Sequence, residues 1–491
     1  MNYRTVVYFL GRIIRIEGLA MLLAVVCSLI YRETVPMVCF LCTAAALILM
    51  GSAFVHIMPP KDKSIGSKDG IVIVALSWII MSVLGAIPFY VSGEIPSYID
   101  AFFETVSGFT TTGSSILTNV EALSHGMNFW RCFTHWIGGM GVLMLMIAII
   151  PKSDVRSSRL MHIMRAEVPG YKVDKVVSKI KNTAIVMYGI YLALTVFEFI
   201  ALLFADMPVY DSLLTALATA GTGGFGVKAD SLASYSPAIQ YVVGAFMLIF
   251  AINFNVYYFI IIKQIKKALR SEELRWFLSG VAVFVAIISF NLVSVYQTAE
   301  ECFRQSFFQV ASIMSTTGFA SADFNLWPDL SKTILFFLIF SGGCVGSTCG
   351  GLKIARLMIL FKSGLREIKQ VFRPRAVISV KLEGKTIENE TIRSTSAYFI
   401  IYCAIILIGA LLIAVFEQTD IITSLTSSMT AVNNVGPGLG EIVGPAGNFS
   451  SFSIASKLIL CFEMLAGRLE LFPMLLIFAP SIWKASRHHS N

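Results

Sequence analysis

Four short loops rich in glycine and threonine are the stretches of this sequence with the clearest capacity for chemistry. They read Thr110-Thr111-Thr112-Gly113, Ala220-Gly221-Thr222-Gly223-Gly224, Ser315-Thr316-Thr317-Gly318 and Asn433-Asn434-Val435-Gly436. Glycine adopts positive φ, which lets successive peptide carbonyls face the same way. A ring of such carbonyls can replace the hydration shell of a weakly hydrated monovalent cation. A filter for divalent cations is expected to carry carboxylates, and none stands at the glycines that we align, which are Gly113, Gly223, Gly318 and Gly436.

A second unusual feature is a segment dense in glycine within an otherwise apolar stretch. Five of the eleven residues from Ser341 to Gly351 are glycines, namely Gly342, Gly343, Gly346, Gly350 and Gly351. Each glycine costs about 1 kcal/mol relative to alanine in a helix interior, so the segment should break a helix in mid-membrane. We expect a movable gate in the pore below the loops. The alternative is close helix packing through small residues.

Arg468 and His135 are two of the charged or titratable side chains that lie inside apolar stretches. An arginine at a helix centre costs about 2.5–3.5 kcal/mol on insertion scales, so Arg468 should face the protein interior or water. Arg468 is predicted either to form an electrostatic barrier in a permeation path or to pair with Glu463 or Glu470. His135 is expected to pack behind the first loop rather than to act in catalysis.

The composition indicates which kind of protein must position these residues. The chain has 491 residues, of which 56% are hydrophobic and 14% charged, and its mean hydropathy is +0.76. A soluble globular protein carries roughly 25% charged residues. These values exclude a secreted enzyme, a nucleic-acid-binding protein and a disordered scaffold, and they predict an all-α polytopic membrane protein.

Ten apolar stretches have the length of a membrane-crossing helix, about 20 residues. They lie near residues 8–31, 36–58, 71–92, 128–150, 183–206, 237–262, 276–296, 332–361, 393–416 and 452–483.

The connections between these stretches differ in charge. Three hold 21 Lys and Arg residues in total, and four hold only two. The basic ones are 151–181, 263–275 and 362–393, and the others are 93–127, 207–236, 297–331 and 417–451. By the positive-inside rule the basic connections are cytoplasmic. Because the number of spans is even, both termini are predicted to be cytoplasmic too.

Each charge-poor connection begins with an apolar segment too short to span, which indicates a re-entrant half-helix. These segments are 99–106, 210–217, 303–310 and 420–425. A unit of helix, half-helix, loop and helix thus occurs four times. The C-terminal ends of four half-helices, each worth about half a negative charge, would favour a cation on their common axis. The predicted units are 1–70 (two extra N-terminal helices), 71–182, 183–275, 276–392 with the glycine-rich segment, and 393–491.

At these residues the chain resembles the Trk/Ktr/HKT superfamily of potassium transporters, and its two extra N-terminal spans favour the Trk type over the shorter Ktr type. The matching motifs are Ser107-Gly108-Phe109-Thr110-Thr111-Thr112-Gly113, Gly223-Gly224-Phe225, Thr317-Gly318-Phe319, Asn433 to Gly440, Gly342 to Lys353 and Gly467-Arg468-Leu469-Glu470. The resemblance implies potassium-binding filter residues at Thr111, Thr112, Gly113, Gly221, Thr222, Gly223, Thr316, Thr317, Gly318, Asn434, Val435 and Gly436. It implies gate roles for Gly342, Gly343, Gly346, Gly350, Gly351 and Arg468.

The resemblance also implies a biological setting. It implies potassium uptake in a bacterial inner membrane, a homodimer with one pore per protomer, and a cytosolic regulatory subunit of the TrkA type. ATP, ADP or NAD would bind that partner, because this chain has no nucleotide motif. Plant relatives with serine at the first filter glycine transport sodium, so Gly113 favours potassium.

We therefore predict a transport protein, not an enzyme, in which K⁺ enters through a selective pore down its electrochemical gradient. The membrane potential supplies about 2.3 kcal/mol per charge per 100 mV. The rival prediction is a symporter coupled to protons or sodium, which would need intramembrane carboxylates such as Glu104, Glu198, Glu463 or Glu470. A polytopic membrane enzyme would need clustered His, Asp or Cys at one depth, and the sequence shows no such cluster.

Overall fold

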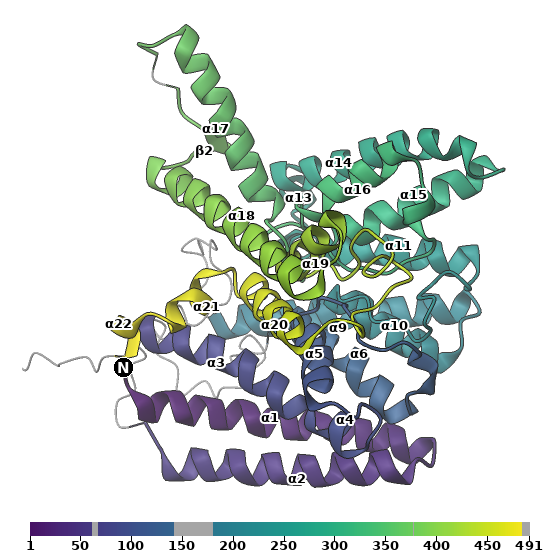
Figure 1. Cartoon of the computed structure of the whole chain (residues 1–491). Helices are drawn as coiled ribbons and strands as arrows, with labels where there is room; N and C mark the ends of the chain where they lie inside the picture. The colour runs from purple at the N-terminus through teal and green to yellow at the C-terminus, as the bar shows by residue number, and fades with distance from the viewer. Residues whose placement is uncertain (61–66, 142–179, 377, 484–491) are drawn as a thin grey trace, which may run out of the picture.

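A computed structural model describes residues 1–60, 67–141, 180–376 and 378–483, and the described chain is predominantly helical (Figure 1). Six of its apolar segments are long enough to cross a membrane, and a seventh is a bent pair of helices. The six are built on α1 (Tyr3–Ile30), α2 (Thr34–Ile57), α3 (Ser67–Gly85), α9 (Ile180–Phe204), α14 (Glu272–Asn291) and α18 (Asn389–Glu417). These helices confirm the prediction of a multi-pass membrane protein.

The two N-terminal helices form a closely packed pair along one side of the bundle (Figure 1). Helix α1 approaches α2 at Gly11 and Gly51, where a Cβ atom on Gly51 would lie 2.5 Å from the Gly11 carbonyl oxygen. Small residues allow this approach of two backbones within a membrane. The pair packs on α3 and α6 (His125–Gly139) through α1.

Four short helices stand at the predicted half-helices. They are α5 (Tyr98–Phe109), α10 (Val209–Gly221), α15 (Ala299–Met314) and α19 (Ile421–Asn433). Each is longer than the apolar segment in the sequence, because it continues through buried Ser, Thr and Ala residues whose peptide groups need hydrogen bonds inside the protein. The side chains of Ser97, Thr298 and Asp420 cap α5, α15 and α19, so three of the four N-terminal ends are fixed by side-chain hydrogen bonds.

The helix that follows each short helix ends after 11 or 15 residues. These helices are α6, α11 (Pro237–Ala251), α16 (Asp329–Ile339) and α20 (Ile454–Arg468). The predicted break in 332–361 is confirmed, because residues 340–353 separate α16 from α17 (Ile354–Phe372). Beyond α6, residues 142–150 of the fourth predicted span lie outside the described residues.

Two predicted spans that we expected to be unbroken are broken. Helix α11 meets α12 (Phe254–Ile261) at 90°, because Asn253 caps α12 through Asn255 N–H at 2.9 Å and Ile252 is extended. The prediction of one helix over 237–262 is therefore wrong. The span 452–483 is divided into α20, α21 (Phe472–Ile477) and α22 (Pro480–Trp483), since Glu470 and Leu471 take positive φ.

Smaller elements complete the described chain. They are α4 (Ile87–Val91), α13 (Ile265–Leu269), the 3-10 turns η1 (Val120–Ala122), η3 (Leu292–Ser294) and η4 (Phe324–Leu326), and a hairpin of β1 (Lys381–Leu382) and β2 (Lys385–Thr386). The hairpin is antiparallel, with Lys381 opposite Thr386. Helix α17 projects from the bundle beside the start of α18 (Figure 1). Most of the basic connection 151–181 lies outside the described residues.

Candidate functional site

The four short helices end in the same backbone geometry. The residue after each helix, or the next one, is left-handed with φ of 53° or 54°, and these residues are Thr111, Thr222, Thr316 and Asn434. The N–H of the following residue bonds to the carbonyl five residues back, as Thr112 does to Ser107 at 2.9 Å and Val435 does to Thr430 at 3.0 Å. This is the Schellman type of helix end. A β-branched residue rarely adopts it, and strain of this kind concentrates at functional sites.

A glycine with positive φ stands two residues after each left-handed residue. These glycines are Gly113, Gly224, Gly318 and Gly436. The sequence aligned Gly223 with this set and left the register of the second loop open by one residue, and the backbone conformation assigns Gly224 to the position instead. Helix α10 includes Gly221, and Thr222 takes the left-handed conformation, so Gly224 is the equivalent of Gly113. Two consecutive glycines gave the sequence no means of choosing between the registers.

The four loops contact one another in a closed ring. A Cβ atom on each of the four glycines would lie against a carbonyl oxygen of the next loop. The distances from the four Cβ positions to these oxygens are 2.1 Å from Gly113 to Gly223, 2.0 Å from Gly224 to Thr317, 2.0 Å from Gly318 to Val435 and 2.7 Å from Gly436 to Thr112. Each partner oxygen belongs to the residue that precedes the glycine of its own loop. We call residues 111–113, 222–224, 316–318 and 434–436 the loop ring. Only glycine permits this approach of backbones.

His135 supports the loop ring from behind. Its Nδ1 lies 2.7 Å from the Gly108 carbonyl oxygen, and its Nε2 lies 3.3 Å from the Phe225 amide nitrogen. Because the amide can only donate, Nε2 accepts and Nδ1 carries the proton, which makes the ring a neutral clamp between the first two loops. The packing role predicted for His135 is confirmed.

A buried ion pair lies between the same two loops. Glu104 and Arg131 are 1% and 3% exposed, and Arg131 Nε lies 2.5 Å from the Glu104 carboxylate. The carboxylate also accepts the Ser115 hydroxyl and the Ile116 amide, at 2.9 and 3.0 Å. The guanidinium lies 3.6 Å from the centre of the Phe225 ring. Glu104 is thus fully engaged in positioning the first loop.

We expect Arg131→Ala to destabilise the protein by about 3–5 kcal/mol, because it leaves the Glu104 carboxylate buried without its counter-ion. The measurement is the thermal unfolding midpoint of the purified protein in detergent. Lys332→Ala is the matched control, since its partner Asp329 has a 96% exposed side chain and exposed pairs contribute little. Equal midpoints for the two variants would contradict the expectation.

The glycine-rich segment lies directly against the loop ring. The Gly350 amide donates to Thr316 Oγ1 at 2.8 Å, and a Cβ atom on Gly350 would lie 2.4 Å from the Asn433 carbonyl oxygen. Gly342, Gly346 and Gly351 have positive φ. The segment also bonds to the break between α11 and α12, through Cys344 N–H to Ala251 O at 2.9 Å. The segment therefore lies against the third and fourth loops and the break between α11 and α12.

Arg468 joins the glycine-rich segment to the end of α6. Its guanidinium donates to the carbonyls of Thr348 at 2.8 Å, Gly138 at 2.5 Å and Gly139 at 2.9 Å. Of the two acids considered from the sequence, Glu470 pairs with Arg356 and Glu463 accepts the Ser428 hydroxyl at 2.7 Å. Arg468 thus faces the protein interior, as the insertion energy predicted.

Sequence reasoning missed Glu273, at the start of α14. Its carboxylate accepts the Val345 N–H of the glycine-rich segment at 2.7 Å. The available signal was a pair of acids, Glu272 and Glu273, in an otherwise basic connection. Among the described residues, no group of three or more His, Cys, Asp or Glu side chains is arranged to hold a metal ion.

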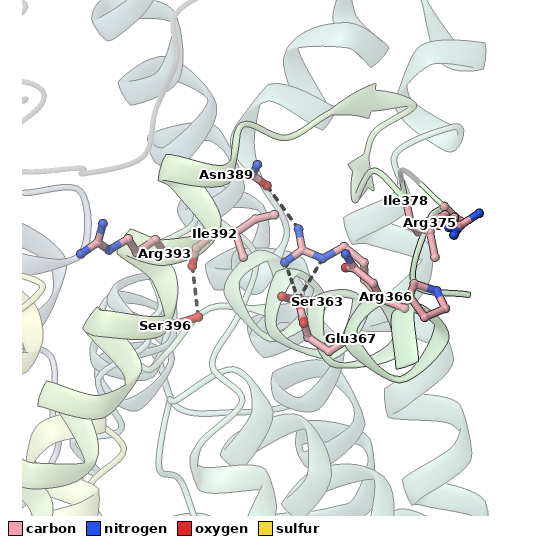
Figure 2. A pocket seen from close by; sticks show the side chains of 12 residues that line it. Ser363, Arg366, Glu367, Arg375, Ile378, Asn389, Ile392, Arg393 and Ser396 are labelled. Atoms are coloured by element: carbon pink, nitrogen blue, oxygen red, sulfur yellow. Dashed lines mark hydrogen bonds and ion pairs between the residues drawn. The ribbon is translucent and has the colours of Figure 1, made fainter. Parts of the chain in front are cut away.

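A basic cavity of about 790 Å³ lies between α17 and α18 (Figure 2). Arg366 lies between the helices and donates to Asn389 at 3.2 Å and Glu367 at 2.6 Å. Arg393 points away from Arg366 (Figure 2). The arginines that line this cavity do not converge, so it is a solvated basic surface rather than a site for one anion.

Comparisons with known proteins give consistent results. Residues 38–485 match the model of the TrkH family, described as cation transport proteins. The chain is 34% identical to the Trk system potassium uptake protein TrkH of Salmonella typhimurium, over 99% of this chain and 100% of that protein. It is 31% identical to TrkG of Escherichia coli, over 99% of each. The crystal structure of the potassium transporter TrkH from Vibrio parahaemolyticus matches with a TM-score of 0.88 and 29% identity, over 99% of this chain and 100% of that one.

Proposed function

Because this chain belongs to the TrkH family of cation transport proteins, we propose that it takes up potassium through the loop ring. The observation that carries the proposal is the closed contact of four equivalent loops, in which the carbonyl before each glycine meets the glycine of a neighbouring loop. Successive carbonyls of this kind can replace the hydration shell of K⁺. The ion is the substrate, and it is bound only at the loop ring.

In this proposal the chain holds four units around one pore, with α1 and α2 outside them. The C-terminal ends of α5, α10, α15 and α19 all lead into the loop ring, so their partial negative charges favour a cation there. The filter residues are those implied by the family resemblance, with the second loop read as Thr222-Gly223-Gly224 in place of Gly221-Thr222-Gly223.

The glycine-rich segment is the gate of the proposed pore. It bonds to Thr316 of the loop ring, and Arg468 holds it to the end of α6. Opening requires the segment to move away from the ring. A cytosolic subunit of the TrkA type, which binds ATP, ADP or NAD, would drive this motion by docking on the Lys and Arg side chains of the basic connections.

The proposal places the protein in a bacterial inner membrane with both termini cytoplasmic. It also includes a homodimer with one pore in each protomer. Helix α17 supports this assembly, because it projects from the bundle (Figure 1) and exposes Phe361, Ile368 and Phe372. Contiguous exposed apolar side chains of this kind mark interaction surfaces.

Cation flux into proteoliposomes that hold the purified chain tests the proposal. We expect potassium and rubidium to enter in response to an imposed membrane potential, and sodium and lithium to enter at least about tenfold more slowly, since tenfold selectivity needs only about 1.4 kcal/mol. Adding the cytosolic partner with nucleotide should raise the potassium flux. Flux that depends on a proton or sodium gradient instead would overturn the channel mechanism.

A proton-coupled symporter is the second candidate function, and Glu198 is the observation that favours it. Its side chain is fully buried in α9, and neither carboxyl oxygen has a hydrogen-bond partner among the described residues. Such a carboxyl can bind and release a proton during transport. If coupling exists, Glu198→Gln should abolish uptake driven by a proton gradient and leave uptake driven by the potential unchanged.

A further inference from the structure

A small hairpin stands where the basic connection 362–393 returns to the bundle. We call residues 380–387 the inner hairpin. Its two strands are joined by Glu383 and Gly384, whose φ values of 51° and 73° are those of a two-residue type I′ turn. Ile387 N–H donates to Val380 O at 2.9 Å and closes the base. Val380 packs there with Ile359 of α17 and Ile392 of α18.

The tip of the inner hairpin is bonded to the first turn of α14. The Glu383 carboxylate accepts the N–H groups of Glu272 and Glu273 at 2.8 and 3.2 Å, and the Ser271 hydroxyl at 3.0 Å. A carboxylate is stabilised at a helix N-terminus by the unpaired N–H groups and the helix dipole. In return, Glu383 N–H donates to the Glu272 carboxylate at 3.1 Å. The hairpin and α14 are therefore joined in both directions.

The same turn of α14 is bonded to the glycine-rich segment on its other side. Glu273 is 8% exposed, and its carboxylate accepts Val345 N–H at 2.7 Å. The Lys353 ammonium, just beyond the segment, interacts electrostatically with the same carboxylate. A hydrogen bond to a buried charged group contributes more than one between neutral groups. Glu273 is thus the link between α14 and the segment.

A lysine of α17 bonds to both α14 and the inner hairpin. Lys362 forms an ion pair with Glu272, and its ammonium also donates to the Lys381 carbonyl of the hairpin at 2.9 Å. Displacement of the hairpin therefore pulls on both α14 and α17, which flank the glycine-rich segment. The path from the hairpin to the segment consists of hydrogen bonds throughout.

We propose that Glu273 is a positioning residue that holds the gate closed, and that the inner hairpin is the lever that releases it. A partner that draws the hairpin outward would pull Glu383 from α14, shift the first turn of that helix, and withdraw Glu273 from Val345. This inference rests on the proposed function, in which the glycine-rich segment is the gate. It assigns the element on which the regulatory partner acts.

The buried thiols of Cys344 and Cys349 provide a direct readout of the segment, since they are only 1% and 3% exposed. The experiment measures their rate of alkylation by N-ethylmaleimide in proteoliposomes, with peptide mass spectrometry to resolve each cysteine. We expect Glu273→Gln and Glu383→Gln each to raise this rate about tenfold, as the loss of a charge-assisted hydrogen bond implies. Cys132 and Cys461, also buried, should stay protected, which excludes general unfolding.

Glu390→Gln is the matched control, because Glu390 is exposed in the first turn of α18 and makes no hydrogen bond or ion pair among the described residues. Its alkylation rate should equal that of the unaltered protein. The double variant of Glu273 and Glu383 should react no faster than the faster single variant, since the two changes break one path. The lever would be overturned if the increases in alkylation rate multiplied in the double variant, or if Glu383→Gln did not change the rate.

Potassium flux measured on the same vesicles separates this inference from the proposed function. Flux and alkylation that rise together support both. Faster alkylation without any potassium flux would support the lever and contradict the proposed transport function. If the Glu273→Gln and Glu383→Gln variants showed unchanged alkylation rates and normal potassium flux, only the lever would be overturned.

Discussion

Gly113→Ser is expected to abolish the potassium selectivity of the loop ring. The new Cβ atom would lie 2.1 Å from the Gly223 carbonyl oxygen of the next loop, so the two loops must separate. Gly113 also has φ of +83°, where a side chain adds strain of about 1–2 kcal/mol. Since about 1.4 kcal/mol corresponds to a tenfold change, we expect sodium flux to approach potassium flux. Parallel flux measurements with both ions check the result.

Gly93→Ser is the matched control for this prediction. Gly93 has φ of +78°, but a Cβ atom there would meet nothing within 4 Å. The two substitutions therefore add similar backbone strain, and only one displaces a carbonyl of the ring. If Gly113→Ser retained the selectivity of the Gly93 variant, the ring would not be the filter.

Arg468→Ala is expected to raise the potassium flux of the chain in the absence of any partner. The change removes three hydrogen bonds that hold the glycine-rich segment to the end of α6. Charge-assisted hydrogen bonds contribute about 1.5–3 kcal/mol each, so the loss of even one favours the open state about tenfold or more. The measurement is potential-driven potassium flux into proteoliposomes at equal protein content.

Two comparisons make the Arg468 prediction specific. Arg468→Lys keeps the charge and can still reach one carbonyl, so its flux should be intermediate. Arg32→Ala removes an exposed arginine from the turn between α1 and α2 and should leave the flux unchanged. A fall in flux in the Arg468→Ala variant would show that Arg468 supports conduction instead of closure.

Much of the helical framework could be predicted from the sequence, because it follows from local properties of the chain. The long apolar runs predicted α1, α2, α3, α9, α14 and α18, since a bilayer permits only segments that satisfy their own hydrogen bonds. The short apolar segments before each loop predicted α5, α10, α15 and α19. The five glycines from Gly342 to Gly351 predicted a break, because glycine weakens any helix.

The bend between α11 and α12 was not predicted, because part of its cause lies in bonds to residues that are distant in sequence. Residues 249–254 are apolar except for Asn253, which did not interrupt the predicted span, yet the chain turns by 90° there. Cys344 bonds to Ala251, and the Gly346 carbonyl accepts Phe254 N–H at 3.0 Å. These tertiary bonds satisfy the peptide groups that a bend would otherwise leave unpaired in the membrane.

Composition and local residue spacing were sufficient to predict a polytopic helical protein with four glycine-bearing loops, because both are properties of short stretches of the chain. How those loops contact one another depends on the packing of distant segments. The contacts concerned join segments that are far apart in the chain. They are the contact of Gly224 with the Thr317 carbonyl, the hydrogen bonds of Arg468 to three carbonyls, and the hydrogen bond between Val345 and Glu273. Contacts of this kind depend on the packing of whole helices, and no local pattern of residue types encodes them.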